Sequence, residues 1–177
     1  NAHDHITYIQ NNPYTDTGER YEHRHDWRRG LNGHTEIPST GSASNNAKHW
    51  GELRFMIGGA TSTIGSGSVA GGLRNLDVSS AQEGLTDQMA VDYDTFPLGD
   101  SNGTQLADSC SYPSINTNQA ISGEDAYFPH IAEGINAYAR NEFFCIADDT
   151  YGVEDLLEPQ SAFIHSVGLN PMDHARM

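Results

Sequence analysis

Hydrophobic residues occur along this chain in short clusters, separated by polar segments rich in glycine, serine and asparagine. Runs of four to six residues that are mostly apolar or alternate with polar positions predict short strands. These runs are residues 5–9, 53–57, 73–78, 143–146 and 162–167. A helical period is present over residues 130–141, where Ile131, Ile135 and Tyr138 fall on one stripe, and less clearly over residues 81–90.

The order of these elements shows no alternation of strand and helix, which argues against a doubly wound nucleotide-binding fold. The pattern instead predicts a mainly β or α+β single domain of irregular architecture. We expect long Gly/Ser/Asn-rich loops, one or two short helices and an N-terminal arm.

Residues 1–50 differ from the remainder because they are rich in histidine and arginine, poor in apolar residues and interrupted by turn signals. We predict a His/Arg-rich arm or extended loop region over residues 1–50 and an acidic globular domain over residues 51–177. Because the chain begins at Asn1 rather than at a methionine, we expect a processed product or a fragment.

The chain is strongly acidic, with 9 Lys+Arg against 24 Asp+Glu and a net charge of −15. The bases of residues 55–177 are only Arg74, Arg140 and Arg176. Such a surface repels phosphate, so nucleic acid is not an expected partner, whereas cations are attracted. A solvated acidic surface explains the same composition without a ligand. No run approaches the ~20 apolar residues that cross a bilayer, so membrane insertion is not expected.

Cys110 and Cys145 are the two cysteines, and in an oxidising compartment they would form a disulfide. Lys48 is the only lysine, and residues 102–104 form an Asn-Gly-Thr glycosylation sequon. Together these features predict a secreted or otherwise extracytoplasmic protein, with the two cysteines paired.

Two His-x-His pairs stand in the N-terminal region. Alternate residues of a strand point to one face, so each pair could offer two imidazoles to one ion of Zn, Cu or Fe, with an aspartate nearby. The candidate ligands are His3, His5, His23, His25 and Asp26. Arginines interleaved with the second pair oppose metal binding. The alternative is an arm that is exposed or contacts a neighbouring subunit.

A second group of oxygen-bearing side chains lies near glycines that permit sharp turns, as Ca²⁺-binding loops require. The candidate calcium ligands are Asp92, Asp94, Asp100, Asn102 and Asp108. Ordinary Asx and glycine turns explain this pattern equally well.

Motifs for a serine nucleophile, a nucleotide-binding P-loop or a zinc protease are absent. The sequence therefore favours a non-catalytic extracellular structural, assembly or binding domain, stabilised by Ca²⁺ and one disulfide. Its expected partner is another protein or a second copy of the chain. The alternative function is a metal-dependent enzyme, a hydrolase or an oxidoreductase, that uses the His-x-His pairs.

Overall fold

The structure is a computed structural model that describes residues 2–3, 16–37, 43–65, 69–84, 91–148 and 154–177. The chain divides into two compact units, and each contains one short sheet with parallel strand pairing. The first unit consists of residues 1–16 and 38–91, and the second of residues 17–37 and 92–177. Helices and sheets occur together, which confirms the predicted α+β class. In the described part, no helix combines the length and apolarity that a membrane crossing needs.

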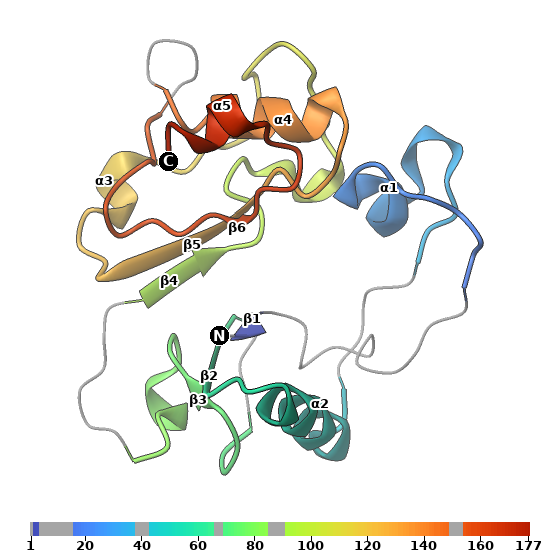
Figure 1. Ribbon diagram of the computed structural model, residues 1–177. Coiled ribbons are helices and arrows are strands. Elements are labelled where there is room, and N and C mark those ends of the chain that lie inside the picture. Colours follow the sequence, from blue (N-terminus) through green and yellow to red (C-terminus); the bar gives the residue numbers. More distant parts are fainter. Residues whose placement is uncertain (1, 4–15, 38–42, 66–68, 85–90, 149–153) are drawn as a thin grey trace. The chain divides into compact units, whose positions relative to one another are not determined.

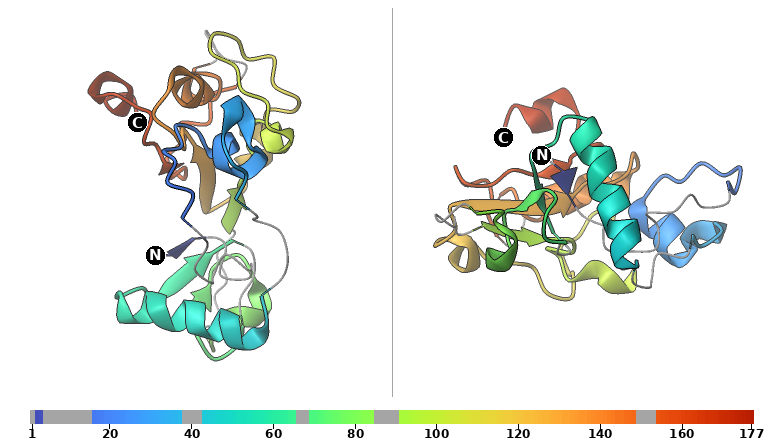
Figure 2. Two further views of the ribbon diagram at one scale, coloured as in Figure 1. Left: turned by 90° about the vertical axis from the view of Figure 1, so that its right-hand side faces the viewer. Right: turned by 90° about the horizontal axis from the view of Figure 1, so that it is seen from below.

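The first unit contains a three-stranded sheet in the order β1-β2-β3, with both strand pairs parallel. Figures 1 and 2 show α2 beside these strands. Its elements are β1 (Ala2–His3), α2 (Asn45–Ile57), β2 (Ser62–Ile64), β3 (Arg74–Asn75) and a 3-10 turn (Ser79–Ala81). The strand predicted over residues 73–78 is therefore present in shorter form.

The long helix α2 replaces the strand predicted over residues 53–57. The Ser44 side chain accepts a hydrogen bond from the N–H of Ala47 and caps the helix. Glu52 is fully buried on the inner face, where its carboxylate accepts hydrogen bonds from the N–H groups of Val69 and Leu73. A short apolar run does not distinguish strand from helix by itself, and the cap decides the matter here.

The second unit contains a sheet in the order β4-β5-β6, in which β5 and β6 are parallel. Figure 1 shows these three strands side by side. Its helices and strands are α1 (Arg24–Arg29), β4 (Val91–Asp94), α3 (Asn118–Ile121), β5 (Ala126–Ile131), α4 (Ala137–Phe144), β6 (Ile164–His165) and α5 (Pro171–His174). Two 3-10 turns lie at Leu31–Gly33 and Asp100–Asn102.

The main hydrophobic core lies in this second unit. The core side chains include Tyr127 and Ile131 of β5 and Phe143 of α4, all of which are fully buried. Cys110 and Cys145 are bonded to each other, with Cα atoms 5.4 Å apart, so the predicted pairing is confirmed. The bond ties the loop after β4 to the end of α4.

The strands β5 and β6 are parallel and are joined through α4, so strand, helix and strand do alternate here. The expectation of no such alternation is wrong. The helix predicted over residues 130–141 is also wrong at its start, because His130 and Ile131 belong to β5 and α4 begins only at Ala137. The strand predicted at residues 143–146 is wrong, because these residues form the end of α4 and the turn after it. The strand predicted at residues 162–167 contains β6.

Residues 17–37 of the predicted arm pack within the second unit, where α1 is buried at its start. The boundary at residue 50 stays a prediction. The strand predicted at residues 5–9 and most of the helix predicted at residues 81–90 lie outside the described residues.

Candidate functional site

The helix α1 begins with three consecutive side chains, His23, Arg24 and His25, of which none is more than 2% exposed. His23 is the N-cap: its Nδ1 accepts a hydrogen bond of 3.1 Å from the backbone N–H of His25. The Asp26 carboxylate accepts in return from the N–H of His23, at 3.0 Å. This reciprocal cap fixes the start of a helix of only six residues, which would be unstable by itself.

Arg24 places a buried positive charge between two buried carboxylates. Its Nη2 lies 2.5 Å from Asp100 Oδ2 and 3.5 Å from Glu142 Oε1, and both acids are fully buried. Its Nη1 donates to the carbonyl oxygens of Thr95, at 2.7 Å, and His130, at 3.3 Å. The guanidinium therefore joins three separate segments of the second unit.

Each of these carboxylates also accepts a hydrogen bond from one histidine. His23 Nε2 lies 3.1 Å from Glu142, and His25 Nε2 lies 2.8 Å from Asp100. The Nδ1 of His25 lies 2.8 Å from a guanidinium nitrogen of Arg28, which can only donate. Because both Nδ1 atoms accept, both Nε2 atoms carry the proton and both imidazoles are neutral.

The pKa shifts of His25 and Asp100 agree with the neutral form of His25. Burial lowers the pKa of His25, and the positive charge of Arg24 adds to that effect. Burial alone would raise the pKa of Asp100, but the hydrogen bond from His25 and the charge of Arg24 outweigh it and lower the pKa. Neutral histidine and ionised aspartate are therefore the forms stable near neutral pH.

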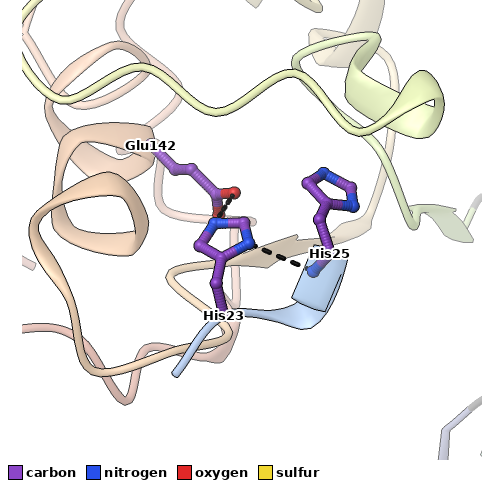
Figure 3. Close-up of side chains that lie close together, drawn as sticks. All are labelled: His23, His25 and Glu142. Atoms are coloured by element: carbon purple, nitrogen blue, oxygen red, sulfur yellow. Dashed lines mark hydrogen bonds and ion pairs between the residues drawn. The ribbon is translucent and has the colours of Figure 1, made fainter. Parts of the chain in front are cut away.

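His23, His25 and Glu142 form a buried group that could hold a metal ion, since one ligand atom of each lies within 4.8 Å of the others. In Figure 3, His23 stands between the Glu142 carboxylate and the backbone of His25. A metal would have to displace the His23 proton and to compete with Arg24 for Glu142. The group is therefore already satisfied by protons and by a buried cation.

A different group of polar side chains lies at the carboxyl ends of β5 and β6. His130 is the penultimate residue of β5 and His165 the last of β6, and their ring centroids are 5.2 Å apart. Glu133 Oε2 lies 3.5 Å from His165 Nε2. His130 is buried, whereas the side chains of His165 and Glu133 are 24% and 27% exposed. Open α/β sheets bind their ligands at such strand ends.

The backbone around this second group is strained. Ala132 follows β5 with a φ of 52°, and His165 and Ser166 have φ values of 73° and 54°. Left-handed conformations of residues other than glycine cost about 1–3 kcal/mol each and gather at functional sites. Strain at the ends of both strands marks this position independently of the side chains.

No protein-family model, curated protein or solved structure matches this chain. Its function has to be inferred from the geometry of these two groups.

Of the predicted transition-metal ligands, His23 and His25 do lie together. Asp26 is the third residue of α1, and its carboxylate completes the cap by accepting from the backbone N–H groups of Glu22 and His23. The backbone of His3 ends β1 in the first unit, and His5 lies outside the described residues. Convergence of the two His-x-His pairs stays a prediction.

The predicted calcium ligands have several different environments. Asp92 and Asp94 belong to β4, and Asp100 faces Arg24 and His25 in the buried network. The side-chain oxygen of Asn102 accepts from the backbone N–H and hydroxyl of the threonine two residues later, as in an Asx turn. Calcium binding by these residues stays a prediction.

Sequence reasoning missed His130, Glu133, His165 and Glu142. A signal was available for His130 and Glu133. Pro129 stands in the apolar run just before them, and a proline is unfavourable inside a helix, so the run could have been predicted as a strand that ends near these two residues. For Glu142 there was none, because an acid in a helix is normally exposed.

Proposed function

We propose that the protein is a metal-dependent hydrolase with its active site at the carboxyl ends of β5 and β6. The observation that carries this proposal is the contact between the His130 and His165 rings, whose centroids are 5.2 Å apart, with Glu133 beside His165. His130 Nδ1 faces the carbonyl of Asp94, so Nε2 would be its ligand atom. The three side chains would have to draw together around an ion, since the three described ligand atoms that already lie within 4.8 Å of one another are those of His23, His25 and Glu142. Two imidazoles and a carboxylate are common ligands for Zn²⁺ and similar ions.

The exposure of the three side chains supports catalysis rather than a closed structural site. His130 is buried, whereas His165 and Glu133 reach solvent and would leave a coordination position for water. His130, His165 and Glu133 would hold the ion, and a bound Zn²⁺ would supply a water of lowered pKa, about 7, at the open position.

The buried group of His23, His25 and Glu142 fits this role less well. All three side chains are buried, and the ring nitrogens of both histidines already have hydrogen-bond partners. A substrate needs an open position on the metal, which a fully enclosed group lacks.

Metal binding tests the proposal directly. Titration of the metal-free chain with Co²⁺ should give one tight site with visible absorption bands, and His165→Ala and His130→Ala should each remove it. The matched control is His174→Ala, because His174 is exposed in α5. The parent chain and His174→Ala should hydrolyse at least one of a panel of ester and amide substrates, and His165→Ala and His130→Ala should not. Unchanged Co²⁺ binding in both strand-end variants would exclude this active site.

A non-catalytic binding or assembly domain is the second candidate function. It is favoured by the large apolar side chains that α2 exposes, among them Trp50 at 56% and Ile57 at 77%. A protein partner or a second copy would bury them. The disulfide is compatible with an oxidising compartment, and a secreted location belongs to this proposal. Sedimentation of the chain with and without Ile57→Lys tests self-association through α2.

A further inference from the structure

The segment that carries His130 and Glu133 is held by hydrogen bonds from outside its own strand. Glu142 Oε2 accepts from the backbone N–H of Ala132 at 2.9 Å. The backbone N–H of Arg24 donates to the carbonyl of Glu133 at 2.9 Å, and its Nη1 donates to the carbonyl of His130 at 3.3 Å. The backbone is thus held at residues 130, 132 and 133 by hydrogen bonds from α1 and α4.

We propose that Glu142 and Arg24 are positioning residues for the strand-end site, because they fix the backbone of residues 130–134. This inference rests on the proposed function. Neither side chain touches a substrate; both act on the backbone that carries His130 and Glu133, while the His130 ring itself contacts the carbonyl of Asp94 at 3.2 Å.

The need for such a hold follows from the conformation of Ala132. With a φ of 52°, this alanine is in a region that it avoids without support from its surroundings. The hydrogen bond to Glu142 is donated by the N–H of Ala132 itself. The carbonyl of Ala132 accepts from the N–H of Gly168 at 3.1 Å. The strained turn redirects the chain directly between His130 and Glu133.

Close backbone approach supports the same assignment. A Cβ atom on Gly134 would lie 2.5 Å from the carbonyl oxygen of Glu22, so the two segments are in direct contact. The N–H of Ile135 donates to that same carbonyl at 2.8 Å. The start of α1 therefore packs directly against the turn after β5. This contact places the Arg24 side chain inside the core.

The remaining members of the network hold the two positioning residues. His23 donates to the second oxygen of Glu142, and Asp100 pairs with Arg24. His25 in turn donates to Asp100. Buried ion pairs are poor stabilisers compared with apolar packing of the same volume, so stability alone does not account for so many enclosed charges.

The variant Glu142→Gln tests the proposal, with Co²⁺ as the probe. It keeps the shape of the side chain but turns an amide N–H₂ toward His23 or Ala132, both of which donate. We expect Co²⁺ affinity to fall about 10- to 100-fold, as for other residues that orient metal ligands, and the visible Co²⁺ bands to shift at saturation. Arg24→Lys should act in the same direction, since a lysine cannot supply the planar fork.

The matched control is Asp173→Asn, which breaks the 2.7 Å ion pair between Arg140 of α4 and α5 without touching residues 130–134. It should leave Co²⁺ affinity and bands unchanged. A rescue variant adds Ala132→Gly to Glu142→Gln, because glycine adopts the left-handed conformation without strain. Partial recovery of Co²⁺ affinity is the expected result.

The outcomes separate this inference from the proposed function. If His165→Ala removes Co²⁺ binding while Glu142→Gln and Arg24→Lys keep the affinity and bands of the parent, the positioning role is wrong and the active site stands. If His165→Ala has no effect, the strand-end site itself is wrong, and the positioning role is lost with it. Loss of affinity in Glu142→Gln without a band shift and without rescue would also overturn the positioning role.

Discussion

Glu142 and His23 form a buried hydrogen bond of 3.1 Å between residues 119 positions apart in the sequence. The second carboxylate oxygen of Glu142 accepts from the backbone of Ala132 at 2.9 Å. One side chain thereby connects α4 to the start of α1 and to the turn after β5. Four predictions follow from this network, from the disulfide and from the packing of α2.

Removal of the Glu142 side chain should destabilise the second unit severely. In Glu142→Ala, the charge of Arg24 and the N–H groups of His23 and Ala132 lose an acceptor inside the core. Breaking a buried pair from one side costs about 3–5 kcal/mol, and we expect a loss of that order in the free energy of unfolding in urea. Glu22→Ala removes an exposed acid nearby and should change it by less than about 0.5 kcal/mol. Equal effects of the two substitutions would contradict the buried network.

Stability should fall as the pH is lowered below the ordinary pKa of histidine, about 6.5. Burial lowers the pKa of His25 in the folded chain. As the pH falls, the unfolded chain therefore binds this proton first and is stabilised relative to the folded chain. This contribution is complete above pH 6.5 and is lost as the pH falls toward the lowered pKa. The pKa of Asp100 is also lowered, so its contribution is lost only in more acidic solution, below about 3.9.

Urea unfolding at several values between pH 8 and pH 4.5 measures this dependence. In His25→Gln, the curve should be flatter than in the parent chain just below pH 6.5. The matched substitution at an exposed histidine is His174→Gln in α5. A parent slope that survives His25→Gln would assign the effect to another histidine.

The disulfide should supply a large part of the stability of the second unit. Cys110 and Cys145 are 35 residues apart, and closure of a loop of that length stabilises by roughly 3–4 kcal/mol in the chain-entropy model. The double variant Cys110→Ser with Cys145→Ser should lose about that much in urea unfolding. The parent chain, denatured without reductant, should contain no free thiol; a finding of two would refute the bond.

Gly72 should not tolerate a side chain while Glu52 is present. A Cβ atom on Gly72 would lie 1.6 Å from Glu52 Oε2, the oxygen that accepts from the N–H of Leu73. Gly72→Ala should therefore displace the carboxylate and lower the melting temperature of the first unit. Gly123→Ala, at a position with open space, should be nearly neutral.

A double-mutant cycle identifies the cause of that loss. In a Glu52→Ala background the clash is gone, so Gly72→Ala should cost less than it does in the parent chain. Additive effects of the two substitutions would show that the contact does not carry the penalty.

Some features of this protein were determined by the sequence alone. The pairing of Cys110 with Cys145 followed from their being the two cysteines, in a composition typical of oxidising compartments. The α+β class followed from short apolar clusters of both periods. Both are properties of composition or local pattern, which do not depend on how distant segments meet.

The tertiary structure decided the remaining features. Residues 53–57 form the end of a helix rather than a strand, because a serine nine residues earlier caps it and an acid within it binds a distant loop. Glu142 looks like any surface acid of a helix until Arg24 and His23 are brought against it from 118 and 119 residues away. His130 and His165 meet only through the parallel pairing of β5 and β6. Contacts between distant segments decide which polar side chains become buried. The order of polar and apolar residues along the chain does not specify these contacts.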